Sequence, residues 1–182
     1  QEKKEKSPTR IKNWEGYVRA CRLKNPDSIP GKPYKSSRIK PFSDYIEDIP
    51  VHRNVVLLQT HPGWGKTSIV GDVLFPTKEN IDSKTKIWFG TLDEFVFYSE
   101  SAEEEELRSS IFILDDLHRE LDFTKKSSDD KDEDWMRVKI QEIIEKINDI
   151  SASAKGIIIT CRIGEWKGEL YEQLDLISET FT

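Results

Sequence analysis

The chain contains several short runs of mostly apolar residues, and each run predicts a strand that is buried on both faces. The runs are residues 55–58 (VVLL), 86–92 (KIWFGTL), 111–114 (IFIL) and 157–160 (IIIT), and a weaker one closes the chain at residues 176–182. No run approaches the roughly 18 apolar residues of a membrane-spanning helix. We therefore expect a protein that does not cross a membrane.

The segments between these runs show the spacing of amphipathic helices. Near the N-terminus, Trp14, Tyr17, Val18 and Cys21 recur at i, i+3, i+4 and i+7. Further helices are predicted at residues 38–49 and 66–74, within residues 94–108, and at residues 134–150, where isoleucines line one face. Strands that alternate with helices favour an α/β fold with three layers, α-β-α, around a parallel sheet.

Charge divides the chain into two parts. The net charge of the 182 residues is −6, yet residues 1–40 hold twelve Lys and Arg against four Asp and Glu. We therefore expect a basic N-terminal arm and linker over residues 1–40 and one core domain over residues 41–182. Such an arm could bind nucleic acid. Contact with the acidic core, or with another domain of the same polypeptide, is favoured because the arm has no aromatic and basic repeat.

Other features of the composition bear on the environment of the protein. Cys21 and Cys161 are far apart in the sequence and have no partners at metal-ligand spacing. We therefore expect neither a disulfide nor a zinc site. We do expect a cytoplasmic location, where cysteines stay reduced. The only methionine is Met136, so we expect the chain to be part of a longer polypeptide. A polar run at residues 124–134 predicts a mobile surface loop.

The first apolar run leads into a turn that is rich in glycine and then into a predicted helix. Residues 60–68 read THPGWGKTS, which differs from the phosphate-binding pattern G-x-x-x-x-G-K-[ST] only in Thr60, at the first glycine. Such a loop presents backbone N–H groups and the side chain of its lysine to phosphates. The hydroxyl of the serine or threonine that ends the pattern ligates Mg²⁺. An ordinary turn between a strand and a helix is the alternative. We expect nucleotide contacts from His61, Pro62, Gly63, Trp64, Gly65, Lys66, Thr67 and Ser68.

Two further apolar runs end in residues that suit phosphate chemistry. Residues 111–116 read IFILDD, and ligands of open α/β sheets bind at the carboxyl ends of the strands. We expect Asp115 to hold Mg²⁺ together with Thr67, and Asp116 to orient or deprotonate the attacking water. Residues 156–162 read GIIITCR and end in Thr160 and Arg162, which could sense a terminal phosphate. An acidic turn and a basic surface residue are the alternatives.

Together the three motifs resemble those of P-loop NTPases of the additional-strand class. Within that class, ILDDLH followed by IIITCRIGEW is similar to the STAND NTPases, which are relatives of the NB-ARC and NACHT switch domains and of AAA+ ATPases. The resemblance implies the sheet order 5-1-4-3-2, with Lys66 after strand 1, Asp115 at the end of strand 3 and Arg162 after strand 4, near the γ-phosphate. It also implies a helical lid, which we expect to follow Thr182.

The sequence therefore predicts an ATPase that binds ATP or ADP with Mg²⁺. Two departures from the family pattern are Thr60 in place of glycine and Asp116 where many AAA+ ATPases have glutamate, and the second favours slow hydrolysis. We expect a nucleotide-controlled switch in a signalling or defence protein that self-associates. The alternatives are an AAA+-like ATPase that remodels protein or nucleic acid, and a nucleotide-binding scaffold without turnover.

Overall fold

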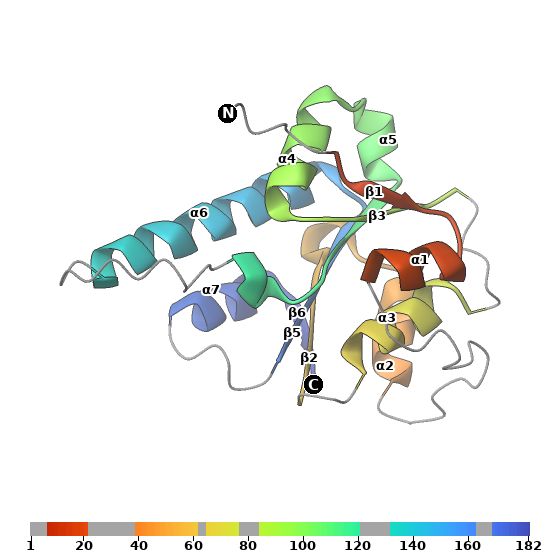
Figure 1. Ribbon diagram of the computed structural model, residues 1–182, viewed down its shortest axis with the longest axis horizontal. Coiled ribbons are helices and arrows are strands. Elements are labelled where there is room, and N and C mark those ends of the chain that lie inside the picture. Colours follow the sequence, from red (N-terminus) through yellow and green to blue (C-terminus); the bar gives the residue numbers. More distant parts are fainter. Residues whose placement is uncertain (1–6, 22–38, 62–64, 77–83, 121–131, 163–168) are drawn as a thin grey trace.

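The computed structural model describes residues 7–21, 39–61, 65–76, 84–120, 132–162 and 169–182, and a six-stranded sheet runs through them (Figure 1). The order of the strands across the sheet is β1-β3-β4-β5-β2-β6. In chain order they are β1 (Thr9–Ile11), β2 (Val55–Thr60), β3 (Lys86–Phe89), β4 (Ser110–Leu114), β5 (Gly156–Arg162) and β6 (Glu179–Phe181).

The parallel part of the sheet has the expected order. β3 pairs with β4, β4 with β5, β5 with β2, and β2 with β6, and all these pairs are parallel. Counted from β2 as strand 1, this is the order 5-1-4-3-2. β1 is an addition that the sequence did not indicate. It pairs antiparallel with β3 and places Ile11 opposite Ile87, so that part of the N-terminal arm lies in the sheet.

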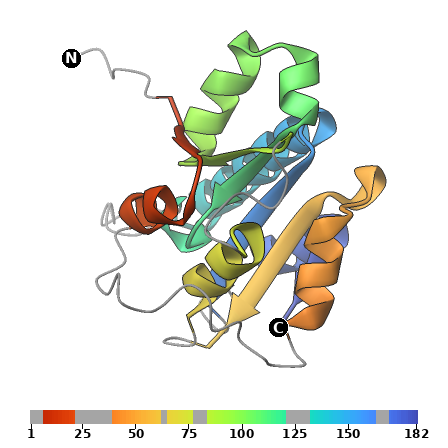
Figure 2. The same ribbon diagram turned by 90° about the vertical axis from the view of Figure 1, so that its right-hand side faces the viewer.

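Helices cover both faces of the sheet (Figures 1 and 2). Those that the structure describes are α1 (Trp14–Cys21), α2 (Lys40–Glu47), α3 (Lys66–Leu74), α4 (Leu92–Ser101), α5 (Glu104–Arg108), α6 (Asp132–Ser153) and α7 (Glu169–Ile177). Short 3-10 turns, Val51–Arg53 and Leu117–Glu120, precede β2 and follow β4. Within the described residues, no helix combines the length and the apolar composition that crossing a membrane requires.

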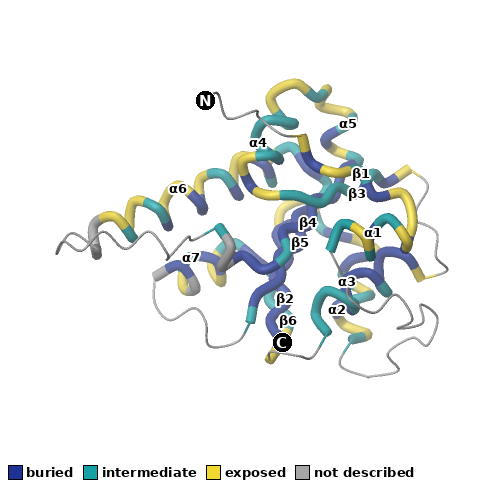
Figure 3. The backbone as a smooth tube through the Cα atoms, in the orientation of Figure 1, coloured by how far each residue is buried: buried dark blue, intermediate teal, exposed yellow. Residues whose placement is uncertain are grey.

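The sheet is buried on both faces because successive residues of a parallel strand enter different cores. Along β2, Val55 and Leu57 pack with α4, α6 and α7, whereas Val56 and Leu58 pack with α1, α2 and α3. The same alternation holds in β5. Figure 3 shows that the buried residues follow the central strands. The three-layer α/β fold expected from the sequence is therefore confirmed.

Some boundaries differ from the sequence-based expectations. β3 ends at Phe89 because Thr91 caps α4: its hydroxyl accepts a hydrogen bond from the Glu94 N–H, and its own N–H donates to the Glu94 carboxylate. The strand expected at residues 176–182 begins only at Glu179, because Leu176 and Ile177 belong to α7, a helix that was not predicted.

Two expected loops fall mainly outside the described residues. The second half of the expected N-terminal arm and linker is one of them, because residues 22–38 are not described. Most of the polar run at residues 124–134 is the other, since residues 121–131 are not described. The end of that run is helical rather than a loop, because α6 begins at Asp132.

Candidate functional site

The turn from β2 to α3 ends in a backbone conformation that requires glycine. Gly65 has φ 72° and ψ 33°, in the left-handed region, and directly precedes Lys66, the first residue of α3. Thr60 ends β2 without a positive φ, so the freedom of a glycine is not needed at that position. His61 is exposed. Pro62, Gly63 and Trp64 lie outside the described residues, and their contact with a nucleotide stays a prediction.

Lys66 and Asp116 form a buried ion pair at the start of α3. The distance between Lys66 Nζ and Asp116 Oδ1 is 2.6 Å, and the two side chains are 11% and 7% exposed. Asp116 has φ 55° and is, among the described residues other than glycine, the one with a positive φ. Aspartate tolerates this region better than most residues do. The carboxylate thus faces the amine that the sequence assigns to phosphate.

Asp115 joins α3 to β5 through two hydroxyl groups. The Thr67 hydroxyl donates to Asp115 Oδ1 at 3.0 Å, and the Thr160 hydroxyl donates to the same oxygen at 2.7 Å. Thr160 is fully buried, and its Oγ1 also accepts a hydrogen bond of 2.9 Å from the Asp116 N–H. One threonine of β5 therefore holds both aspartates.

Arg162 and Ser68 lie at the same edge of the sheet. Arg162 is the last residue of β5 and pairs in register with Thr60, the last residue of β2. Ser68 lies in the first turn of α3 and is partly exposed. The carboxyl ends of β2, β4 and β5 meet here, and this edge is where open α/β sheets bind ligands. The structure thus brings Lys66, Thr67, Asp115, Asp116 and Thr160 into contact, with Arg162 beside them.

The donor atoms at this edge suit a magnesium ion that is bound together with a substrate. Mg²⁺ prefers oxygen ligands and is commonly held by one or two protein groups plus substrate phosphates. Thr67 Oγ1 and Asp115 Oδ1 offer such a pair of oxygens. In the described part of the chain, no group of three or more His, Cys, Asp or Glu side chains offers a metal site made of protein alone.

Tyr17 of α1 is a residue of this region that the sequence analysis did not identify. Its side chain is fully buried, and its hydroxyl donates to the main-chain carbonyl of Thr67 at 2.5 Å. Burial raises the pKa of Tyr17 well above its ordinary value, so the phenol stays protonated and able to donate. The helix spacing predicted α1, but a contact between residues 50 positions apart has no local signature.

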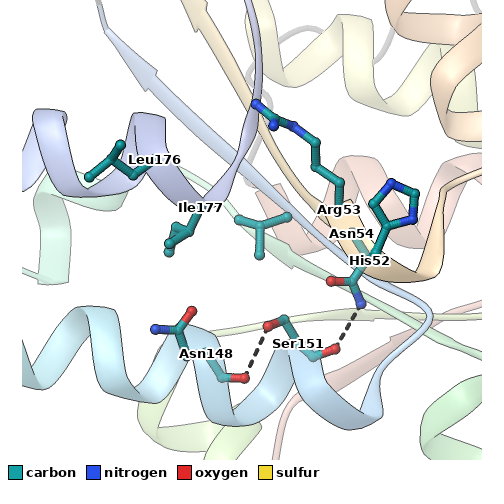
Figure 4. A pocket seen from close by; sticks show the side chains of 8 residues that line it. His52, Arg53, Asn54, Asn148, Ser151, Leu176 and Ile177 are labelled. Carbon is teal, nitrogen blue, oxygen red and sulfur yellow. Dashed lines mark hydrogen bonds between the residues drawn. The ribbon is translucent and has the colours of Figure 1, made fainter.

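A hollow of about 310 Å³ lies at the other end of β2, away from Lys66 (Figure 4). The Asn54 side-chain amide donates to the carbonyls of Ser151 and Ala154 at 2.8 and 3.0 Å and so ties the start of β2 to α6. This hollow is distinct from the site at the carboxyl edge. Its lining residues are His52, Arg53, Asn54, Val55, Asn148, Ser151, Leu176 and Ile177.

Comparisons with known proteins show likeness at the level of the fold. No protein-family model and no curated protein matches the sequence. Among solved structures, C. elegans PCH-2 is similar with 13% identity and a TM-score of 0.47 over 82% of this chain and 44% of that chain. The DnaC helicase loader is similar with 17% identity and a TM-score of 0.43 over 85% of this chain and 93% of that chain.

A third similar structure is domain III of the Thermotoga maritima replication initiation protein DnaA, with 16% identity and a TM-score of 0.44 over 85% of this chain and 64% of that one. The chain thus spans less than half of the PCH-2 chain. The strand order, and the turn from β2 through Gly65 into α3, give this chain the α/β fold of a P-loop NTPase core.

Proposed function

We propose that this chain is a module that binds ATP with Mg²⁺ and hydrolyses it slowly. The main support is that the first two residues of α3 each bind a carboxylate. Lys66 forms an ion pair with Asp116, and the Thr67 hydroxyl donates a hydrogen bond to Asp115. A lysine and a hydroxyl at a helix N-terminus supply what a triphosphate needs, namely a cation for its oxygens and a ligand for its metal. The two carboxylates complete the set at the carboxyl edge of the sheet.

The residues of the site have separable roles in this proposal. Lys66 exchanges the Asp116 carboxylate for phosphate oxygens, since an ammonium group pairs with either anion. Asp116 is then released beside the phosphates, where it can orient a water molecule and accept its proton. Thr67 and Asp115 would hold Mg²⁺, which neutralises charge that develops on the phosphates. Arg162, next to Thr60, would approach the terminal phosphate.

The buried Lys66–Asp116 pair supports a switch rather than a fast enzyme, because the pair must separate before the carboxylate can act on water. We propose that the full-length protein changes state with its nucleotide and self-associates when ATP is bound, in a signalling or defence role of the STAND type. An AAA+-like remodelling ATPase would instead show fast turnover and assemble without a trigger. A scaffold would bind nucleotide without turnover.

The test is titration of a fluorescent ATP analogue with Mg²⁺ against the wild type and Lys66→Ala. Loss of a charge-assisted contact should weaken binding about ten- to a hundredfold. Lys146→Ala is the matched control, because the Lys146 amine pairs with Asp93 of α4, at 2.8 Å, and not with a carboxylate of the candidate site. Melting curves on each protein check that the fold is kept.

Lys66→Ala leaves the Asp116 carboxylate buried without its cation, and this could unfold the domain for reasons unrelated to nucleotide. The double variant Lys66→Ala with Asp116→Asn removes both charges and keeps the test valid. Equal nucleotide affinity in the wild type and the double variant would refute the proposed function. Hydrolysis by the wild type, measured as phosphate release, separates an ATPase from a scaffold.

A further inference from the structure

The N-terminal segment packs against the helix that begins the candidate site. β1 adds to the sheet beside β3, and α1 follows it and lies against α3 on one face of the sheet (Figures 1 and 2). Trp14 and Tyr17 of α1 are 4% and 0% exposed. The ring centroids of Trp14 and Tyr17 are 5.9 Å apart, and so are those of Tyr17 and Phe75, which follows the last residue of α3. The contact is therefore a packed aromatic core rather than a loose surface contact.

A glycine allows the two helices to come this close. A Cβ atom on Gly71 would lie 2.3 Å from Trp14 Cζ3 and 2.5 Å from Tyr17 Cε1, distances at which atoms overlap. Gly71 lies in the middle of α3, where glycine costs roughly 1 kcal/mol relative to alanine. Its absent side chain leaves the space through which the Tyr17 ring reaches the first turn of α3.

The Tyr17 hydroxyl reaches the main chain of that turn. It donates to the Thr67 carbonyl at 2.5 Å. Helix geometry directs that carbonyl towards the N–H of Gly71, and a carbonyl oxygen has a second lone pair for the phenol. The side chain of Thr67 meanwhile donates to Asp115. Tyr17 thus holds the main chain of Thr67, and the hydroxyl of Thr67 faces the Asp115 carboxylate.

We propose that Tyr17 is a positioning residue that fixes the first turn of α3, so that Thr67 presents its hydroxyl beside Asp115 for Mg²⁺. This inference rests on the proposed function for its consequence, but its geometric part concerns the protein without nucleotide. It also gives the N-terminal segment a role in the site, since a partner that pulled α1 from α3 would weaken Mg²⁺-dependent binding without touching the nucleotide.

The experiment compares Tyr17→Phe with Tyr45→Phe in the full chain. Tyr45 is the matched control because its hydroxyl also donates to a main-chain carbonyl, that of Arg53 at 2.6 Å, at the far end of β2. The first readout is hydrogen exchange of the α3 amides without nucleotide. The second is the affinity for ATP measured once with Mg²⁺ and once with EDTA.

Tyr17→Phe should speed amide exchange in the first turn of α3 by about three- to tenfold, the effect of losing the hydrogen bond to the Thr67 carbonyl. It should reduce the gain in affinity that Mg²⁺ provides by about the same factor. Affinity in EDTA should change less than twofold, and Tyr45→Phe should leave both readouts at wild-type values. Unchanged exchange in Tyr17→Phe overturns the positioning role. Faster exchange with an unaltered Mg²⁺ gain makes Tyr17 structural only, which also overturns it.

A wild-type chain that binds no ATP in either buffer would refute the proposed function, and with it the Mg²⁺ role of Tyr17. The exchange readout would still decide whether Tyr17 holds the first turn of α3. The two failures are therefore distinguishable, because one appears in the wild type and the other only in Tyr17→Phe.

Discussion

Thr160 connects the two carboxylates of the site through a single hydroxyl group. It donates to Asp115 and accepts from the main chain of Asp116, and it is fully buried. The contact with Asp116 matters because Asp116 has a positive φ, a conformation that persists only where its surroundings hold it. Thr160 therefore couples β5 to the geometry of the acidic pair.

Replacing Thr160 with valine should separate this polar role from packing. Thr160→Val keeps the shape but leaves the buried Asp116 N–H unpaired, which costs about 1–3 kcal/mol of unfolding free energy. Thr160→Ser, the control, keeps the hydroxyl and loses a methyl group, which costs roughly 0.8 kcal/mol. Urea unfolding gives both values. Only the valine variant should also lose Mg²⁺-dependent ATP affinity, and an equal loss in the serine variant would contradict the role given to the hydroxyl.

At the scale of elements, the packing of α1 on α3 depends on one small residue. Gly71→Ala places a Cβ against Trp14 and Tyr17, and such overpacking costs about 1–3 kcal/mol, more than the roughly 1 kcal/mol that alanine adds to helix stability. Gly16→Ala in α1 is the control, since its Cβ would meet only Asn13 Oδ1, at an ordinary 3.4 Å. Thermal melting should therefore show Gly71→Ala below the wild type and Gly16→Ala at or above it.

Equal melting temperatures for Gly71→Ala and Gly16→Ala would mean that α1 can shift without cost. The close approach of the two helices would then not be a requirement of the fold.

The strands that the sequence predicted best are those in which nearly every consecutive residue is apolar. β2, β4 and β5 are apolar almost throughout, because both of their faces are covered. β1 has only Ile11 buried among its three residues, so no periodicity marks it. α7 was predictable in principle, since Leu170, Leu174 and Ile177 follow helical spacing, but the apolar residues near the chain end favoured a strand.

The same distinction holds in the site. Lys66, Thr67, Asp115 and Asp116 come from motifs in which a strand end and a polar residue are neighbours in the sequence. Their pairing follows from the strand order, because parallel strands bring their carboxyl ends together. Tyr17 belongs to no such motif. Its contact depends on where α1 lies in the fold, and tertiary packing of this kind is not encoded by local spacing.

At the scale of the whole molecule, the charge pattern and the packing disagree on whether the N-terminal segment is separate from the core domain. The excess of Lys and Arg in residues 1–40 predicts an arm apart from the core domain. Ile11, Trp14 and Tyr17 are nevertheless buried with residues of α3 and β3 in one core. The basic side chains Lys12 and Arg19 are exposed on the outside of this segment. Charge therefore describes its surface, while apolar contacts set its place.

Deletion of residues 1–21 tests whether the stability of the core domain depends on the N-terminal segment. Burying each large apolar side chain contributes about 1.5–3 kcal/mol, and a domain has a total of only about 5–15 kcal/mol. Removing Ile11, Trp14 and Tyr17 should therefore abolish cooperative unfolding or lower the melting temperature steeply. Exchange of the exposed Lys12, Glu15 and Arg19 for serine should leave melting near the wild type. A shortened chain that melts like the wild type would instead make the arm separable from the core, as its charge predicts.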